Sequence, residues 1–145
     1  MASSVWLRCC AALDAGAGIA NNRRFFGATF MTQTLIFNLD EADFEAQVIE
    51  ASRTTPILVD FWADWCPPCI VLTPVLERVV NGYGGKIRLA KVEVDEGENM
   101  RLAGRFGLRG FPTVLLFEQG EERGRFSSAH PDGWVKDFIQ QHVAL

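Results

Sequence analysis

The chain has 145 residues, of which 48% are hydrophobic and 22% are charged, and its formal net charge is −4. This length and composition are typical of one globular domain. A net negative charge offers no basic surface to nucleic acid, and no apolar run approaches the length of a membrane span, so neither partner is expected. Its 4 cysteines are too few for a scaffold held together by disulfides.

Residues 1–33 differ in composition from the rest of the chain. They are rich in Ala, Gly and Ser, and their charged residues are three arginines and one aspartate. We expect an N-terminal extension here, disordered or missing from the mature protein, and a folded domain over residues 34–145. Cys9 and Cys10 lie in the extension and are interpreted as incidental to catalysis.

Three interpretations of the extension stay open. Met31 directly precedes the expected domain, so the first thirty residues could be upstream sequence that is not normally translated. Arginines with few acids are also typical of a mitochondrial transit peptide. The third interpretation is a tail of unassigned role. The expected location is the cytoplasm, with the mitochondrion as the alternative if residues 1–30 are a transit peptide.

The domain is expected to begin with a short strand over residues 35–37. Asp40 then stands where a helix cap is expected. The helix that follows carries Phe44, Val48 and Ile49 at helical spacing. This spacing predicts one buried side for the helix.

Residues 57–63 form a nearly continuous apolar run, which is typical of a central strand covered on both faces. Apolar residues at helical spacing then predict a helix over residues 67–81. Residues 87–94 form the next strand, and the intervening helix makes the unit βαβ with parallel strands. A short helix is expected over residues 97–106.

The last third of the domain begins with two strands, predicted over residues 114–117 and 123–126. The polar residues 118–121 form the turn of a hairpin, so these strands are antiparallel. A closing helix is predicted over residues 131–143. Its expected buried side carries four residues: Trp134, Val135, Phe138 and Ile139.

Two thiols stand where the central strand gives way to a helix, in the run Trp65-Cys66-Pro67-Pro68-Cys69. If Cys66 is the N-cap, the prolines occupy the first turn, where a missing N–H costs little. Cys66 and Cys69 are three residues apart on one helix face, close enough to join in a disulfide.

The positive end of the helix dipole stabilises a thiolate, so Cys66 is predicted to attack and Cys69 to resolve. Two alternatives are half of a zinc site and a pair of inert core cysteines. Zinc normally takes four ligands, and the remaining candidates, His130 and His142, lie far along the chain. We therefore expect no metal and no cofactor beyond the redox-active disulfide.

Three segments carry a resemblance to a known family: residues 59–69 (VDFWADWCPPC), 90–95 (AKVEVD) and 110–117 (GFPTVLLF). In this order and spacing the chain resembles the thioredoxin family over residues 34–145. The resemblance implies an α/β fold with a central mixed sheet of about five strands flanked by about four helices. It implies a monomer that reduces protein disulfides, with electrons from an NADPH-dependent flavoprotein reductase.

The resemblance also assigns roles to individual residues. Asp60 interrupts a buried apolar strand, so its pKa should be raised, and the family role is proton acceptor for Cys69. Lys91 in the adjoining strand would tune that charge, although a structural pair with Asp60 is the alternative. A cis peptide bond is implied before Pro112.

Substrate binding is assigned by the resemblance to the loop that faces the cysteines. The backbone of Phe111 would pair with an extended substrate segment. Trp65, like Trp62, is interpreted mainly as a packing residue, with substrate contact as its second role.

Three positions depart from the family pattern. Pro67 replaces the usual glycine, so Pro67 and Pro68 are expected to tune the redox potential. Ile70 replaces a basic residue. Residues 127–129 (SSA) replace a loop that often carries Gly-Ala. We predict a protein-disulfide reductase, with an oxidase or isomerase and a non-catalytic binding module as the alternatives.

Overall fold

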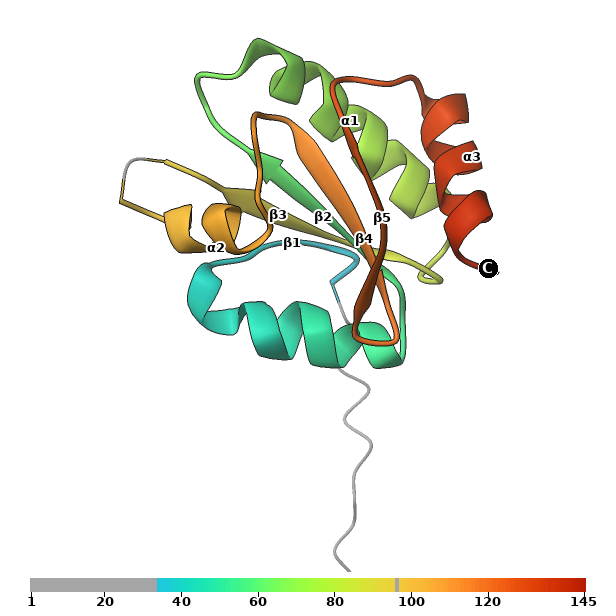
Figure 1. Ribbon diagram of the computed structural model, residues 1–145. Helices are drawn as coiled ribbons and strands as arrows, with labels where there is room; N and C mark the ends of the chain where they lie inside the picture. Colours follow the sequence, from blue (N-terminus) through green and yellow to red (C-terminus); the bar gives the residue numbers. More distant parts are fainter. Residues whose placement is uncertain (1–33, 96) are drawn as a thin grey trace, which may run out of the picture. The chain divides into compact units, whose positions relative to one another are not determined.

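The structure, a computed structural model, describes residues 34–95 and 97–145 (Figure 1). Predictions that concern residues 1–33, including Cys9 and Cys10, lie outside the described residues. The described chain forms one five-stranded sheet with helices on both faces. None of the helices in this part of the chain is both long and apolar enough to cross a membrane.

The predicted order of elements is confirmed. The strands are β1 Ile36–Asn38, β2 Ile57–Trp62, β3 Arg88–Glu93, β4 Thr113–Glu118 and β5 Glu121–Ser127. The helices are a first helical segment, made of η1 Glu41–Asp43, η2 Glu45–Glu50 and η3 Ala51–Arg53, then α1 Pro67–Gly82, α2 Met100–Arg105 and α3 Asp132–His142. The α/β class with a mixed sheet and four helical segments is therefore as expected.

The strand order is β1-β3-β2-β4-β5, which places β2 in the middle of the sheet. β2 pairs parallel with β3 and antiparallel with β4. Asp60 lies opposite Lys91 on one side and Val114 on the other. The first five residues of β2 are buried, as the continuous apolar run predicted.

A hydrophobic core lies on each face of the sheet. On the face of α1 and α3, buried residues include Leu72, Leu76 and Ile139. On the other face, Phe44 and Leu102 pack from the first helical segment and α2, and Figure 1 shows the helices in these two layers. Burying each such side chain contributes roughly 1.5–3 kcal/mol, so both layers hold the sheet that carries the cysteines.

The first helical segment differs from the single capped helix that was predicted. It changes from 3-10 to π and back to 3-10 geometry, and the Asp40 side chain makes no cap hydrogen bond. The cap comes from Asn99, whose Oδ1 accepts from the Glu41 N–H at 2.7 Å. Asn99 Nδ2 donates to the Glu93 carbonyl at 2.7 Å, so a distant loop replaces the local cap.

Two other expectations about helices were wrong in detail. α2 begins at Met100 rather than at residue 97. Trp134 is 40% exposed, because its indole stacks on His130 and on Phe138, with ring centroids at 3.7 and 5.8 Å. The indole therefore covers the flank of Phe126 instead of entering the core.

The β4–β5 hairpin turns at Gln119 and Gly120, both with positive φ (57° and 82°), which suits a tight hairpin turn. The buried Ser52 ties this turn to the first helical segment. Its Oγ donates to the Ile49 carbonyl at 2.8 Å and accepts from the Gly120 N–H at 3.0 Å. Its carbonyl accepts from the Gln119 N–H at 2.9 Å.

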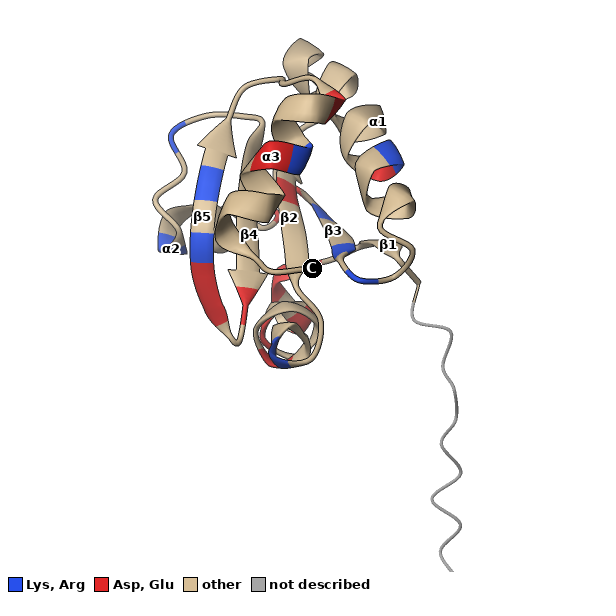
Figure 2. Cartoon of the chain, turned by 90° about the vertical axis from the view of Figure 1, so that its right-hand side faces the viewer, with Lys and Arg blue, Asp and Glu red and all other residues tan. Residues whose placement is uncertain are grey.

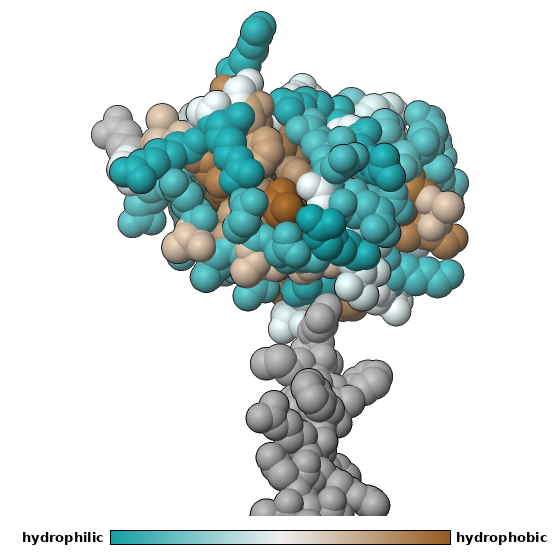
Figure 3. Space-filling model, turned by 60° about the horizontal axis from the view of Figure 1, so that its bottom comes forward, coloured by the Kyte–Doolittle hydropathy of each residue, from teal (hydrophilic) through white to brown (hydrophobic). Residues whose placement is uncertain are grey.

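The edge of the sheet at β5 carries charged side chains. Figure 2 shows bands of acidic and basic residues along β5, one of the two edge strands. Arg125 pairs with Glu122 of the same strand, and Arg123 pairs with Glu118 of β4. Such charges discourage pairing with another edge strand. The face in Figure 3, which includes the first helical segment, is largely hydrophilic with small hydrophobic groups.

Candidate active site

The loop between β2 and α1 holds both cysteines. Cys66 is the N-cap of α1 with extended φ and ψ of −100° and 102°, and Pro67 and Pro68 open the helix. The Cys69 N–H donates to Cys66 Sγ at 3.3 Å. The predicted cap is confirmed, because the residue before a proline avoids the helical region and the ring needs no amide in the first turn.

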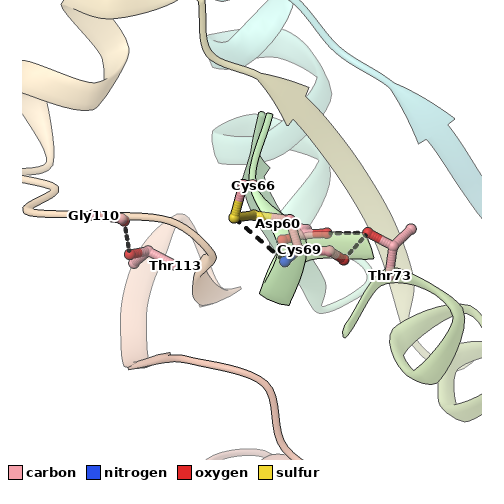
Figure 4. Close-up of a disulfide and its surroundings, with 6 residues drawn as sticks. All are labelled: Asp60, Cys66, Cys69, Thr73, Gly110 and Thr113. Atoms are coloured by element: carbon pink, nitrogen blue, oxygen red, sulfur yellow. Dashed lines mark hydrogen bonds between the residues drawn. A yellow bond between two sulfur atoms is a disulfide. The ribbon is translucent and has the colours of Figure 1, made fainter. Parts of the chain in front are cut away.

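Cys66 and Cys69 form a disulfide, with their Cα atoms 5.3 Å apart (Figure 4). The two residues are only 3% and 1% exposed. They pack with Ala63, and with the partly buried Trp62 and Phe111. The disulfide is therefore buried beneath apolar side chains at the start of α1.

Asp60 lies in the middle of β2 and is 0% exposed. Burial raises its pKa from 3.8 to about 7, and the Thr73 hydroxyl and the Lys91 charge oppose this rise only in part. Asp60 Oδ2 accepts from Thr73 Oγ1 at 3.3 Å, while Oδ1 has no hydrogen-bond partner in residues 34–95 and 97–145. The predicted rise in pKa is confirmed, and Asp60 can exchange a proton near neutral pH.

Lys91 lies beside Asp60 in the sheet register, but it forms its ion pair with Glu77 of α1. Lys91 Nζ is 3.0 Å from Glu77 Oε1. Lys91 lowers the pKa of Asp60 by its charge, while the negative charge of Glu77 raises it. The alternative of a structural Asp60–Lys91 ion pair is therefore not what the structure has, because Lys91 pairs with Glu77.

The Phe111–Pro112 peptide bond is cis, as the resemblance implied. Thr113 Oγ1 donates to the Gly110 carbonyl at 2.7 Å, which fixes the loop before β4 (Figure 4). The Ser128 N–H donates to the Pro112 carbonyl at 3.3 Å. Hydrogen bonds within the loop and to the residue after β5 therefore fix the conformation of the loop.

Trp65 is 64% exposed, so its interpretation as mainly a packing residue was wrong. Its ring meets Phe111 edge to face, with centroids 5.9 Å apart. Beside this pair lies an open groove lined by Trp65, Val94, Asp95, Met100 and Phe111. An apolar groove next to the disulfide can hold the side chain of a bound polypeptide.

The sequence interpretation missed Thr73 and Glu77. Thr73 Oγ1 contacts both Asp60 and the Cys69 carbonyl, the latter at 3.0 Å. A signal was present, because Cys69, Thr73 and Glu77 follow one another at intervals of four, which places them on one helix face.

The departures from the family pattern are at the surface. Ile70 is exposed, so the first turn of α1 presents an apolar side chain where the pattern has a cation. Ser128 adopts φ of +75°, a region that glycine occupies more readily. Within residues 127–129, Ser128 therefore keeps a backbone conformation suited to glycine.

No group of three or more His, Cys, Asp or Glu in residues 34–95 and 97–145 could hold a metal ion. A cystine at a helix start, a buried acid with a pKa near neutrality and a cis-proline loop together define a dithiol–disulfide exchange centre on an α/β fold.

Comparisons with known proteins agree with this class. Residues 35–141 match the family model described as Thioredoxin. The chain is 39% identical over 113 residues to thioredoxin C-2 of Corynebacterium nephridii, covering 78% of this chain and 100% of that protein. It is 42% identical over 108 residues to thioredoxin of Pseudomonas aeruginosa, covering 74% and 96%, and 36% identical over 108 residues to thioredoxin of Haemophilus influenzae, covering 74% and 97%.

The chain therefore belongs to the thioredoxin family. It is a thiol–disulfide oxidoreductase of the protein-disulfide reductase type, as the sequence predicted.

Proposed function

We propose that the reduced chain opens disulfides in partner proteins and is itself re-reduced by an NADPH-dependent thioredoxin reductase, working as a monomer in the cytoplasm. The observation that carries this proposal is the Cys66–Cys69 disulfide at the amino end of α1, beside an acid whose pKa is about 7. A reversible disulfide at a helix start, next to a proton acceptor, suits repeated exchange near neutral pH.

In the proposed reaction, Cys66 attacks first. Its thiolate forms a bond to one substrate sulfur, and the electron pair of the broken bond leaves with the other substrate sulfur. Cys69 then gives its proton to Asp60 and attacks Cys66, which closes the disulfide and releases the second substrate thiolate. The substrate gains two electrons and the Cys66–Cys69 pair loses them.

The loop of Phe111 and Pro112 is proposed to hold the substrate. The Phe111 backbone pairs with an extended segment that bears the disulfide, and Trp65 covers the neighbouring side chain. The groove beside Trp65 and Phe111 supports this placement. Pro67 and Pro68 set the redox potential through the helix start, and Lys91 acts on Asp60 by its charge.

The test is reduction of insulin by dithiothreitol, followed by turbidity, with wild type and Cys66→Ser. We expect wild type to accelerate precipitation and Cys66→Ser to return the rate to that of dithiothreitol alone. Equal rates for the two proteins would refute exchange through Cys66 and would favour the binding module, which uses the Trp65 and Phe111 surface without the thiols.

Two further measurements test the finer points. Wild type mixed with NADPH and thioredoxin reductase should consume NADPH when insulin is added; no consumption would exclude that electron donor. Equilibration with glutathione should place the potential near the reducing end of the thioredoxin-fold range, about −270 mV. A value near about −120 mV, the oxidising end, would favour the oxidase or isomerase.

The cellular location depends on whether residues 1–30 are a transit peptide that is removed from the mature protein. Fractionation of cells with an antibody to the domain should find the protein in the cytoplasm. An intact mass of the native protein that lacks residues 1–30, together with mitochondrial recovery, would instead support the transit peptide.

A further inference from the structure

Thr73 joins two groups that the proposed reaction uses. Its Oγ1 lies 3.0 Å from the carbonyl oxygen of Cys69 and 3.3 Å from Asp60 Oδ2. Figure 4 shows both contacts as dashed lines from the single hydroxyl. Thr73 is half-buried on α1, whereas Asp60 is fully buried on β2, so this hydroxyl is the link between the acid and the backbone of the resolving cysteine.

A threonine hydroxyl has one hydrogen to donate and lone pairs that accept. When Asp60 is ionised, both neighbours of the hydroxyl are acceptors, and only one can take the hydrogen. When Asp60 is protonated, its O–H can donate to Thr73 Oγ1 while Thr73 donates to the Cys69 carbonyl. The two protonation states of Asp60 therefore require two different orientations of the Thr73 hydroxyl.

The charged groups around Asp60 do not replace this contact. Lys91 on β3 faces it across the sheet but bonds Glu77 on α1 at 3.0 Å. On the other side, β4 places the apolar Val114 opposite Asp60. Asp60 Oδ1 has no hydrogen-bond partner, so the Thr73 hydroxyl is the hydrogen-bonding contact found for this carboxyl group within the described chain.

We propose that Thr73 is a positioning residue for the resolving step: its hydroxyl turns from the Cys69 carbonyl to the Asp60 carboxylate when Asp60 ionises, and it thereby readies that carboxylate to accept the Cys69 proton. This inference rests on the proposed function. In the step itself, the proton passes from Cys69 Sγ to Asp60, the Cys66–Cys69 bond forms, and the bond from Cys66 to the substrate sulfur breaks. The electron pair leaves with the substrate sulfur as a thiolate.

The matched variants are Thr73→Val, which keeps the shape without the hydroxyl, and Thr73→Ser, which keeps the hydroxyl. Reduced protein, in which wild type and both variants also carry Cys9→Ser and Cys10→Ser so that Cys66 and Cys69 are the reacting thiols, is mixed with excess dithiobis-nitrobenzoate in a stopped-flow instrument over a range of pH. One thionitrobenzoate is released when Cys66 attacks, and a second is released when Cys69 closes the disulfide. The second phase therefore measures the rate of the resolving step, in which Thr73 is proposed to act.

A hydrogen bond donated to the ionised carboxylate lowers the pKa of Asp60, so its loss should move the inflection of the second phase upward by about one pH unit. At pH 7 the second phase of Thr73→Val should then be about fivefold slower than in wild type. Thr73→Ser should restore the wild-type profile, and the first phase should change little in either variant. A wild-type profile for Thr73→Val, or equal impairment of Thr73→Ser, would overturn the proposal.

A measurement on the wild-type oxidised protein keeps the test independent of how the variants fold. In a carbon NMR titration, the Cys69 carbonyl resonance should move with the same midpoint as the Asp60 carboxyl resonance, because the carbonyl loses its Thr73 bond when Asp60 ionises. A Cys69 carbonyl that does not follow Asp60 would refute the switch. Wild type that fails to reduce insulin would instead refute the proposed function, so the two failures are distinguishable.

Discussion

Ser52 and Asp60 are both buried polar residues, but they differ in how completely their side chains are hydrogen-bonded. Ser52, at the junction of η3 and the hairpin, donates one hydrogen bond through its Oγ and accepts another. Asp60, in the middle of β2, has one hydrogen bond of 3.3 Å and an Oδ1 without a partner among the described residues. A buried polar group without a partner costs free energy, so the hydrogen bonds of Ser52 stabilise the fold, whereas the unpartnered oxygen of Asp60 destabilises it when the carboxyl group is ionised.

The largest expected effect comes from Asp60→Asn. In wild type the pKa is 3.8 unfolded and about 7 folded, so the folded state binds more protons between these values and stability falls as pH rises. Above pH 7 the ionised carboxylate destabilises the fold by about 4 kcal/mol relative to a neutral isostere, from about 1.4 kcal/mol for each pH unit. Urea unfolding should therefore find Asp60→Asn much more stable than wild type at pH 8 and similar to it at pH 4.

The same variant should lose the pH inflection of the resolving step, because asparagine accepts no proton from Cys69. A stability difference that is the same at pH 4 and pH 8 would show that Asp60 is not ionising inside the fold. In that case Asp60 would not be a destabilising buried charge, and it would no longer differ from Ser52 in its effect on stability.

Ser52→Ala should have the next largest effect, with the opposite sign. It leaves the Gly120 N–H without its acceptor, and a buried group left without its partner costs about 1–3 kcal/mol. The loss should be equal at pH 5 and pH 8, and insulin reduction should not change. A loss of reduction in this variant would mean that the hairpin junction is coupled to the site of Cys66 and Cys69.

Ser128→Gly should have the smallest effect and should raise stability. Ser128 has φ of +75°, a conformation that costs a side-chain-bearing residue about 1 kcal/mol. Glycine relieves this cost but gains entropy when unfolded, so we expect a net gain of about 0.5 kcal/mol in urea unfolding. The control is Ala129→Gly, where φ is not positive and stability should fall. Equal losses in both variants would show no strain at Ser128.

Much of this architecture was predictable because its signals are local. The apolar run of β2 predicted its central position, and the two cysteines with their prolines predicted the cap at Cys66. The buried acid in that run predicted the raised pKa of Asp60. Each of these depends on the residue itself and on its neighbours in the chain.

The rest depended on contacts between distant residues. The cap of the first helical segment comes from Asn99, which no local pattern near Asp40 could reveal. Trp134 has helical spacing like that of Val135 and Phe138, but its stacking on His130 keeps it at the edge of the core. The pairing of Lys91 with Glu77 joins a strand to a helix, so it appears only in three dimensions.

The two prolines between the cysteines have a consequence for the entropy of the pair. Their rings fix φ at two consecutive positions, so reduction frees fewer backbone conformations than it would with glycine after Cys66. The effective concentration of one thiol at the other is therefore set in large part by the covalent structure of the dipeptide. From this entropy difference alone, we expect the two prolines to favour the closed disulfide, which would make the reduced pair a stronger electron donor.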